Sequence, residues 1–222
     1  MKDAEIISGD FDRIAGVETD RWGHNNHYHR YLLKHLPEKI GSAVDVGCGT
    51  GEFTRLLAER SSEVTGIDLS HNMLSRALEK AKGIKNVSYV KADFMEYELE
   101  KEQYDCIASI ATVHHLPMEE FLIRAKAALR PGGVLLVLDL YRQENLAEYI
   151  LSAAAAPLNL LFMLVKNGSL RVSEEERRAW QEHARHDSYM SIKDIRKAAD
   201  KIISGAEIHR HLFWRYSLVW KK

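Results

Sequence analysis

The chain has 222 residues with 31 basic and 32 acidic side chains, so its formal net charge is −1. Hydrophobic residues make up 45% and charged residues 28%, which is the profile of a folded globular protein and excludes a disordered or fibrous one. The neutral balance also argues against nucleic-acid binding by phosphate neutralisation, because such domains carry a basic excess.

The sequence predicts a cytoplasmic protein. Its two cysteines are too few for a disulfide framework, which indicates a reducing compartment. Asp3 and Glu5 lie where a signal peptide would have its basic and apolar regions. The longest apolar stretch, residues 150–165, is interrupted by Pro157 and Asn159 and falls short of the roughly 18 residues that a membrane span needs.

Strand and helix patterns alternate from Ser42 onward, after a first segment rich in histidine and aromatic residues that leads into a helix at about residues 27–35. Buried strands are predicted at residues 43–46, 64–69, 87–90, 104–110 and 134–138. Helical faces lie between them, one of them capped by Ser70 and another broken by residues 131–133. This alternation predicts a parallel α/β sheet with right-handed crossovers.

The regular pattern stops after the fifth strand. Residues 141–190 hold an apolar run and then a charged run, and we expect a helical insertion over one edge of the sheet. Ser191 and Asp194 resemble a capping box that starts a last helix, and Gly205 can end it before a final hairpin at residues 208–212 and 216–220. The predicted units are an N-terminal lid (1–41), a core (42–140), a substrate cap (141–190), and a last helix with a hairpin that completes the core (191–222).

A glycine-rich loop follows the first predicted strand, with the sequence VDVGCGTG at residues 44–51. Glycines between a strand and a helix let the backbone approach a ligand closely. A dinucleotide fingerprint would need a third glycine at position 52, where Glu52 would instead repel a pyrophosphate. Asp45, two residues before Gly47, suits a ligand that carries an ammonium group.

Residues 45–51 resemble motif I of the class I S-adenosylmethionine (SAM)-dependent methyltransferases. Four segments resemble the later motifs in the family's order: GIDLS at 66–70, KADF at 91–94, the strand and loop at 104–116, and LRPGG at 129–133. The resemblance covers residues 42–140. It implies a Rossmann-like, mostly parallel seven-stranded sheet of order 3-2-1-4-5-7-6 with helices on both faces, and SAM as the cofactor.

The resemblance also implies the cofactor contacts. Asp45 and the glycines would hold the methionine part, Asp68 the ribose hydroxyls, and Asp93 with Phe94 the adenine. A lone aspartate at a strand end is more often a cap or turn residue, but three at these places favour a cofactor site. The predicted cofactor-binding residues are Asp45, Gly47, Cys48, Gly49, Thr50, Gly51, Asp68, Leu69, Met73, Asp93, Phe94, Ile110 and Ala111.

Methyl transfer from a sulfonium is an in-line displacement that needs a base only when the acceptor arrives protonated. The candidate bases are His114 and His115, just past the fourth strand, and Tyr141 after the fifth. The alternative for the histidine pair is a structural role as a helix cap.

Further histidines and aromatic residues are predicted to surround the substrate. Trp22, His24, His27 and Tyr28 lie on the predicted lid, and His183 is expected to line the substrate pocket. His183 and His186 are three residues apart, as metal ligands sometimes are, but no cysteine or motif-linked acid completes a set. We therefore expect no metal.

The motifs of nucleic-acid and protein-arginine methyltransferases are missing after the fourth strand, where the sequence reads SIAT at residues 109–112. With the neutral charge, this favours a small-molecule acceptor with a nitrogen or oxygen nucleophile, and a monomer or homodimer that binds no nucleic acid. Three alternatives stay open: a non-catalytic SAM-binding regulator, a nucleotide-dependent oxidoreductase, and a nucleic-acid methyltransferase.

Overall fold

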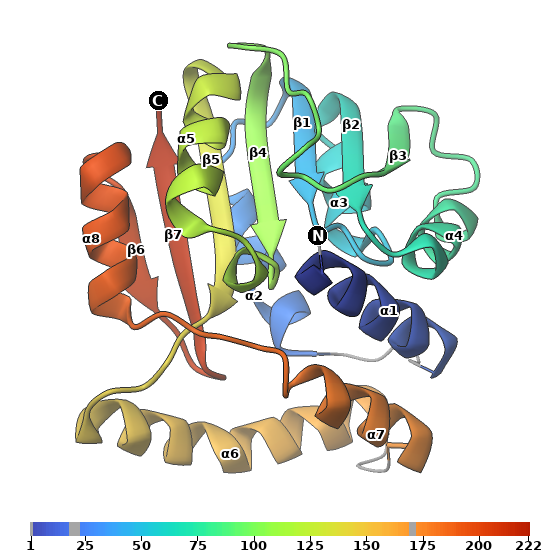
Figure 1. The fold of residues 1–222 in the computed structure, drawn as a ribbon, viewed down its shortest axis with the longest axis vertical. Helices are drawn as coiled ribbons and strands as arrows, with labels where there is room; N and C mark the ends of the chain where they lie inside the picture. The colour runs from blue at the N-terminus through green and yellow to red at the C-terminus, as the bar shows by residue number, and fades with distance from the viewer. Residues whose placement is uncertain (1, 18–22, 169–171) are drawn as a thin grey trace.

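The computed structural model describes residues 2–17, 23–168 and 172–222, which build one seven-stranded sheet of order β3-β2-β1-β4-β5-β7-β6 (Figure 1). β1 to β5 run parallel, and β7 pairs antiparallel with both β5 and β6. The strands are β1 Ile40–Val46, β2 Ser61–Asp68, β3 Val87–Lys91, β4 Tyr104–Ile110, β5 Leu129–Leu140, β6 Glu207–Arg210 and β7 Arg215–Lys221. The predicted fold class and strand order are confirmed.

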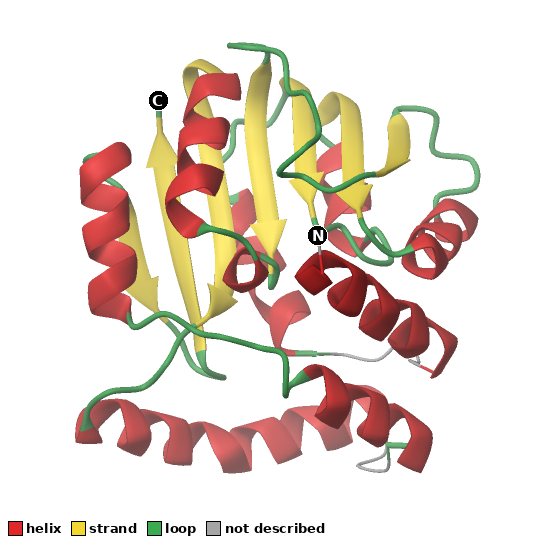
Figure 2. Cartoon of the chain, viewed as in Figure 1, coloured by secondary structure: helices red, strands yellow, loops and turns green. Residues whose placement is uncertain are grey.

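Helices cover both faces of the sheet (Figure 2). The helices are α1 Lys2–Val17, α2 His24–Leu33, α3 Glu52–Ala58, α4 His71–Lys80, the 3-10 helix η1 Val113–His115, α5 Met118–Ala128, α6 Leu146–Asn167, α7 Glu174–His183 and α8 Ile192–Ile202. Successive residues of a strand point to opposite faces. In β5, Leu135 packs in the cluster that includes α5 and α8, whereas Leu136 packs in the cluster that includes α2 and α3.

The helix caps follow the sequence closely. The Ser70 hydroxyl accepts a hydrogen bond from the Met73 N–H at the start of α4, and Ser191 accepts one from the Asp194 N–H at the start of α8. Both caps were predicted. They orient the two helices against the sheet.

The predicted end of the preceding helix near residues 131–133 is confirmed, since α5 ends at Ala128. The predicted strand start at residue 134 is wrong, because β5 starts at Leu129 and continues through this segment. Gly132 has a φ of +82°, and the ladder shifts register between Tyr104 and Cys106. The Gly132 N–H donates to the Lys222 carbonyl, and the Lys222 N–H donates to the Gly133 carbonyl. These two backbone hydrogen bonds hold the irregular segment in the sheet.

The predicted interruption of the apolar stretch is also wrong. α6 runs for 22 residues with Pro157 inside it, although a proline removes one hydrogen bond of a helix. The 20 residues Glu148–Asn167 are long and apolar enough to cross a membrane, and only 13% of the most apolar window is buried. Length and composition alone are a weak indication of a span.

Three helices lie across the carboxyl ends of the strands (Figure 1). α6 and α7 belong to the insertion, whose two ends are joined where Arg142 N–H donates to the Met190 carbonyl at 2.9 Å. α1, for which no helix was predicted, packs against α4 and α7. The N-terminal helix and the insertion therefore meet over the end of the sheet where α/β proteins bind their ligands.

Candidate active site

A cavity of about 800 Å³ lies between the carboxyl ends of the strands and the helices α1, α2 and α7. Its walls come from the glycine loop after β1, the ends of β2 and β4, η1, and residues of α1, α7 and β7. Parallel strands end at the same edge, so residues far apart in the sequence meet here.

Asp45 supplies a buried acid at the end of β1 and is only 1% exposed. Its Oδ2 accepts a hydrogen bond from Thr54 Oγ1 at 2.6 Å, whereas its buried Oδ1 has no hydrogen-bond partner. Burial raises the pKa of this carboxyl to about 7. A buried oxygen without a partner is costly, so this position suits a cationic donor on a ligand.

The three glycines of the loop have different surroundings. A Cβ atom on Gly47 would collide with Thr112, and one on Gly51 would collide with Tyr89. Gly49 has a φ of +53°, and a Cβ atom there would meet nothing within 4 Å. The outer two glycines therefore allow close packing, while the middle one borders open space.

Asp68 at the end of β2 is tied to the same loop. Its Oδ2 accepts from the Gly49 N–H and its Oδ1 from the Ser70 N–H, both at 2.8 Å. Burial raises its pKa. A carboxylate oxygen can accept two hydrogen bonds, and each oxygen of Asp68 accepts one here, so both can also accept a hydrogen bond from a ligand hydroxyl.

The far end of the cavity combines an acid with apolar side chains. Asp93 accepts a hydrogen bond from the Met95 N–H at 2.8 Å. Leu69, Met73 and Phe94 line the same cavity. A flat aromatic ligand with an amino group would find both a hydrogen-bond acceptor and apolar contacts there.

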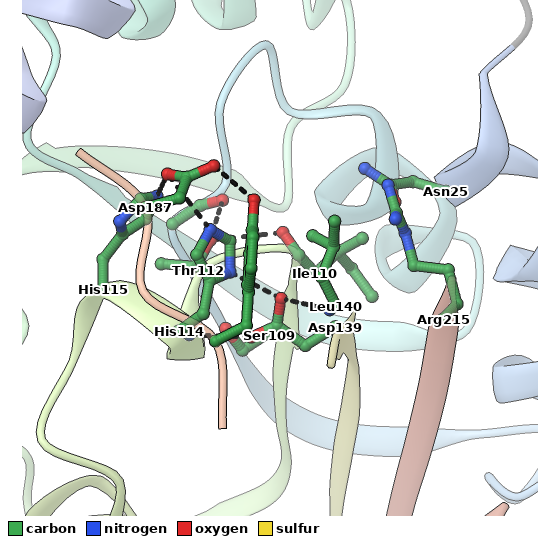
Figure 3. Close-up of polar contacts among 12 residues, drawn as sticks. Asn25, Ser109, Ile110, Thr112, His114, His115, Asp139, Leu140, Asp187 and Arg215 are labelled. Carbon is green, nitrogen blue, oxygen red and sulfur yellow. Dashed lines mark hydrogen bonds and ion pairs between the residues drawn. The ribbon is translucent and has the colours of Figure 1, made fainter. Parts of the chain in front are cut away.

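His114 is held by a fully buried acid at the end of β5 (Figure 3). Its Nδ1 lies 2.6 Å from Asp139 Oδ1, and its backbone N–H donates to Asp139 Oδ2 at 2.8 Å. The carboxylate favours the tautomer with a proton on Nδ1, which leaves a lone pair on Nε2.

A second acid, Asp187, lies beside several histidines (Figure 3). The Nε2 atoms of His114, His115 and His183 are 3.8, 3.7 and 3.4 Å from Asp187 Oδ1. Burial, with the neighbouring His114, lowers the pKa of His115 to about 4, so this ring is neutral near pH 7. We expected no metal because no cysteine or motif-linked acid completes a ligand set, and Asp187 is an acid beside these histidines that no motif marks.

The comparisons with known proteins agree with this geometry. Residues 44–137 match the sequence profile of a family described as a methyltransferase domain. A demethylmenaquinone methyltransferase from Staphylococcus haemolyticus is 30% identical over 140 residues, which are 60% of this chain and 57% of the relative. The chain thus spans little more than half the length of that relative.

Two solved structures share the fold. One is a phosphoethanolamine N-methyltransferase 2 from Haemonchus contortus, solved with phosphomonomethylethanolamine and S-adenosylhomocysteine. It is 24% identical with a TM-score of 0.62, and the alignment covers 93% of this chain and 43% of the chain in that structure. The other is a SAM-dependent methyltransferase from Mesorhizobium loti, which is 20% identical with a TM-score of 0.59. The alignment covers 87% of this chain and 96% of the chain in that structure. The chain therefore shares its fold with SAM-dependent methyltransferases, and residues 44–137 are similar to a methyltransferase domain.

Most of the residues that the family resemblance singled out do line the cavity. Gly51 does not, since its role is packing against Tyr89. Those that line it are Asp45, Gly47, Cys48, Gly49, Thr50, Asp68, Leu69, Met73, Asp93, Phe94, Ile110, Ala111, His114, His115, His24 and His183.

Three predicted residues lie away from this cavity, and Trp22 lies outside the described residues. Tyr141 is 4% exposed within the core cluster that includes α5 and α8, so the structure does not support it as a base. The Tyr28 hydroxyl donates to the Leu212 carbonyl at 3.1 Å. His27 contacts Tyr28 with ring centroids 4.8 Å apart and does not line the cavity.

Arg215 and Phe11 are lining residues that the sequence analysis missed. Arg215 is 8% exposed, and its Nε donates to Asn25 Oδ1 at 2.8 Å (Figure 3). Among the described residues, it forms no ion pair with an acid. No motif marks it, although a cationic residue at the start of a buried strand is a signal that could have been used.

Proposed function

We propose that this protein transfers the methyl group of SAM to a small molecule. When bound, SAM supplies an electrophilic methyl group on a sulfonium. The residues that would hold it are Asp45 at the ammonium group, Asp68 at the ribose hydroxyls, and Asp93 with Phe94 at the adenine.

The observation that carries this proposal is the unsatisfied Oδ1 of Asp45 beside the open space at Gly49. A carboxylate oxygen buried without a partner is costly, and an ammonium group would satisfy it. A pyrophosphate, by contrast, would face the carboxylates of Asp45, Glu52 and Asp68, which all line this cavity. The site therefore favours SAM over a dinucleotide.

The acceptor is proposed to lie beside His114. Asp139 orients this imidazole so that the Nε2 lone pair can take a proton from an acceptor hydroxyl or ammonium group. The enzyme's remaining tasks are to align the nucleophile and to exclude water. Residues 1–41 would act as a lid and residues 141–190 as a substrate cap, since α1 and α7 contribute to the cavity wall.

An anionic or oxygen-rich group on the acceptor would suit Arg215, because a buried guanidinium without an acidic partner favours an anion. The phosphoethanolamine N-methyltransferase that shares this fold was solved with an acceptor that carries a phosphate. A methyl acceptor with a nitrogen or oxygen nucleophile is compatible with the cationic Arg215 and with the acceptor bound in that structure. The neutral net charge supports a small molecule over a nucleic acid, and the two free cysteines support a cytoplasmic location.

The test has two parts. SAM binding is measured by calorimetry in the wild type and in Asp68→Ala, for which we expect at least a tenfold loss of affinity because ligand hydroxyls lose their acceptor. Methyl transfer from labelled SAM is then measured on a panel of small amines, phenols and phosphorylated amino alcohols.

Unchanged SAM affinity in Asp68→Ala would contradict the cofactor assignment. SAM binding without transfer to any acceptor would instead favour a SAM-binding regulator. Steeply salt-dependent binding of RNA or DNA would favour a nucleic-acid substrate.

A further inference from the structure

Three side chains in the acceptor half of the cavity direct ligand atoms toward one point. One ligand atom from each of His114, His115 and Asp187 lies within 4.8 Å of the other two (Figure 3). The Nε2 atoms of the two histidines are 3.8 and 3.7 Å from Asp187 Oδ1. His183 adds a further Nε2 atom 3.4 Å from the same Asp187 oxygen. The group joins η1, the end of α7 and the segment before α8.

Two of these atoms have no hydrogen-bond partner although they are buried. His115 Nε2 and Asp187 Oδ1 are both unpaired, and each side chain is only 7% exposed. They lie 3.7 Å apart, which is beyond hydrogen-bond distance. Unsatisfied buried polar atoms are rare and costly, so a pair that faces each other indicates a missing ligand between them.

The hydrogen bonds made by the other polar atoms of these side chains match those that metal ligands usually make. A histidine that binds a metal usually donates its other ring N–H to a carboxylate, and a ligating carboxylate is usually hydrogen-bonded itself. His114 Nδ1 is 2.6 Å from Asp139, and His183 Nδ1 is 3.4 Å from Asp10. The Tyr189 hydroxyl donates to the second oxygen of Asp187.

We propose that His114, His115 and Asp187 bind a divalent first-row transition metal ion, with His183 beside the site but outside the coordination sphere. Bonds of about 2.0–2.2 Å in a tetrahedral site place the ligand atoms roughly 3.3–3.6 Å apart. The distances to Asp187 Oδ1 of 3.8 and 3.7 Å need only a small contraction to reach this range. Two imidazoles select zinc, cobalt, iron or nickel over magnesium and calcium.

The ion would lie in the cavity that also holds the SAM-binding residues. A metal that keeps an open position binds an oxygen and makes a bound hydroxyl more acidic. In that state the Nε2 lone pair of His114 is used by the metal, so the acceptor hydroxyl loses its proton to water instead of to this histidine. This role in the reaction rests on the proposed function, whereas metal binding itself does not.

Cobalt(II) is the probe, because its visible absorption reports coordination independently of any methyl transfer. We expect one equivalent to bind the full-length wild type with a spectrum typical of nitrogen and oxygen ligands. His115→Ala and Asp187→Asn should each lower the affinity at least tenfold, as losing even an outer contact of a metal site costs 10–100-fold. His209→Gln, an exposed histidine on β6, is the matched control and should bind as the wild type does.

The variants are first checked by thermal denaturation and SAM binding, and His115→Gln replaces any variant that does not fold. Absence of stoichiometric cobalt binding would overturn the proposal, as would binding that His115→Ala leaves intact or that His209→Gln abolishes. Cobalt binding without methyl transfer would contradict the proposed function and leave the metal site standing. Methyl transfer without cobalt binding would contradict the metal site and leave the proposed function standing.

Discussion

At the scale of single residues, Asp45 connects burial to ligand binding. Its pKa of about 7 lies above the ordinary value of 3.8 because the carboxyl is buried. The free protein therefore keeps this carboxyl largely protonated below pH 7, whereas pairing with an ammonium group requires the carboxylate. Ligand binding must then displace the proton.

We expect SAM binding to release up to one proton below pH 7 and the affinity to rise with pH until about pH 7. Calorimetry in two buffers with different ionisation enthalpies measures the protons released. Asp45→Asn is the control and should show no release from this site, together with weaker binding. Equal proton release in both proteins would show that another group titrates.

At the scale of elements, the start of α3 depends on the glycine loop. Gly51 is the N-cap residue of α3 and has a φ of +72°. An alanine in this left-handed region is strained by about 1–2 kcal/mol, and at Gly51 its Cβ would also collide with the half-buried Tyr89 side chain. Gly49, in the same loop, has the positive φ without the collision.

We expect Gly51→Ala to lower the free energy of unfolding by at least about 1 kcal/mol more than Gly49→Ala, because only the first variant adds overpacking. Urea denaturation measures both. Gly49→Ala should instead weaken SAM binding, since its methyl group would enter the open space. Equal losses of stability would contradict the different roles assigned to the two glycines.

The sequence predicted those elements whose signals are local. Strand periodicity and the capping serines Ser70 and Ser191 are readable within a few residues, so the strands and two helix starts could be expected. The order of the strands in the sheet was implied by the family resemblance. The acids at the strand ends were found because a family motif marks each of them. These signals need no knowledge of how distant segments pack.

What the sequence did not show depends on distant contacts. Asp10 reaches His186 at 2.7 Å across 176 positions of the chain, and Asp187 lies 3.7 Å from His115 across 72 positions. No spacing rule links such pairs, so the histidine cluster went unpredicted. Residues 1–41 were expected as a lid, but the packing of α1 against α4 and α7 was not. Arg215 was missed for the same reason, since its partner Asn25 lies 190 residues away.

At the scale of the whole molecule, α6 presents a large apolar surface. Leu161, Leu164 and Val165 are 55%, 52% and 69% exposed, whereas Ala155 on the same helix is fully buried against the core. Exposed apolar side chains of this kind contribute little to folding, and contiguous ones promote association.

Replacing Leu161, Leu164 and Val165 together by lysine should leave the thermal stability nearly unchanged and should shorten retention on a hydrophobic column. Ala155→Leu, on the buried side, is the matched comparison and should cost about 1–3 kcal/mol by overpacking. Denaturation curves and chromatography measure the two effects. A large loss of stability in the triple variant would show that this face is covered.

The junction at the base of the insertion has a consequence for how this protein can tolerate changes in the insertion. Arg142 and Ser191 form a parallel bridge, and the Arg142 N–H bonds the Met190 carbonyl, so the chain leaves and re-enters the core at nearly one point. The core requires only that these two ends stay together, because closing a longer or shorter loop between them changes the free energy little. Residues 143–189 can therefore be exchanged as a cassette, together with the α1 face that packs on them, without redesigning the sheet.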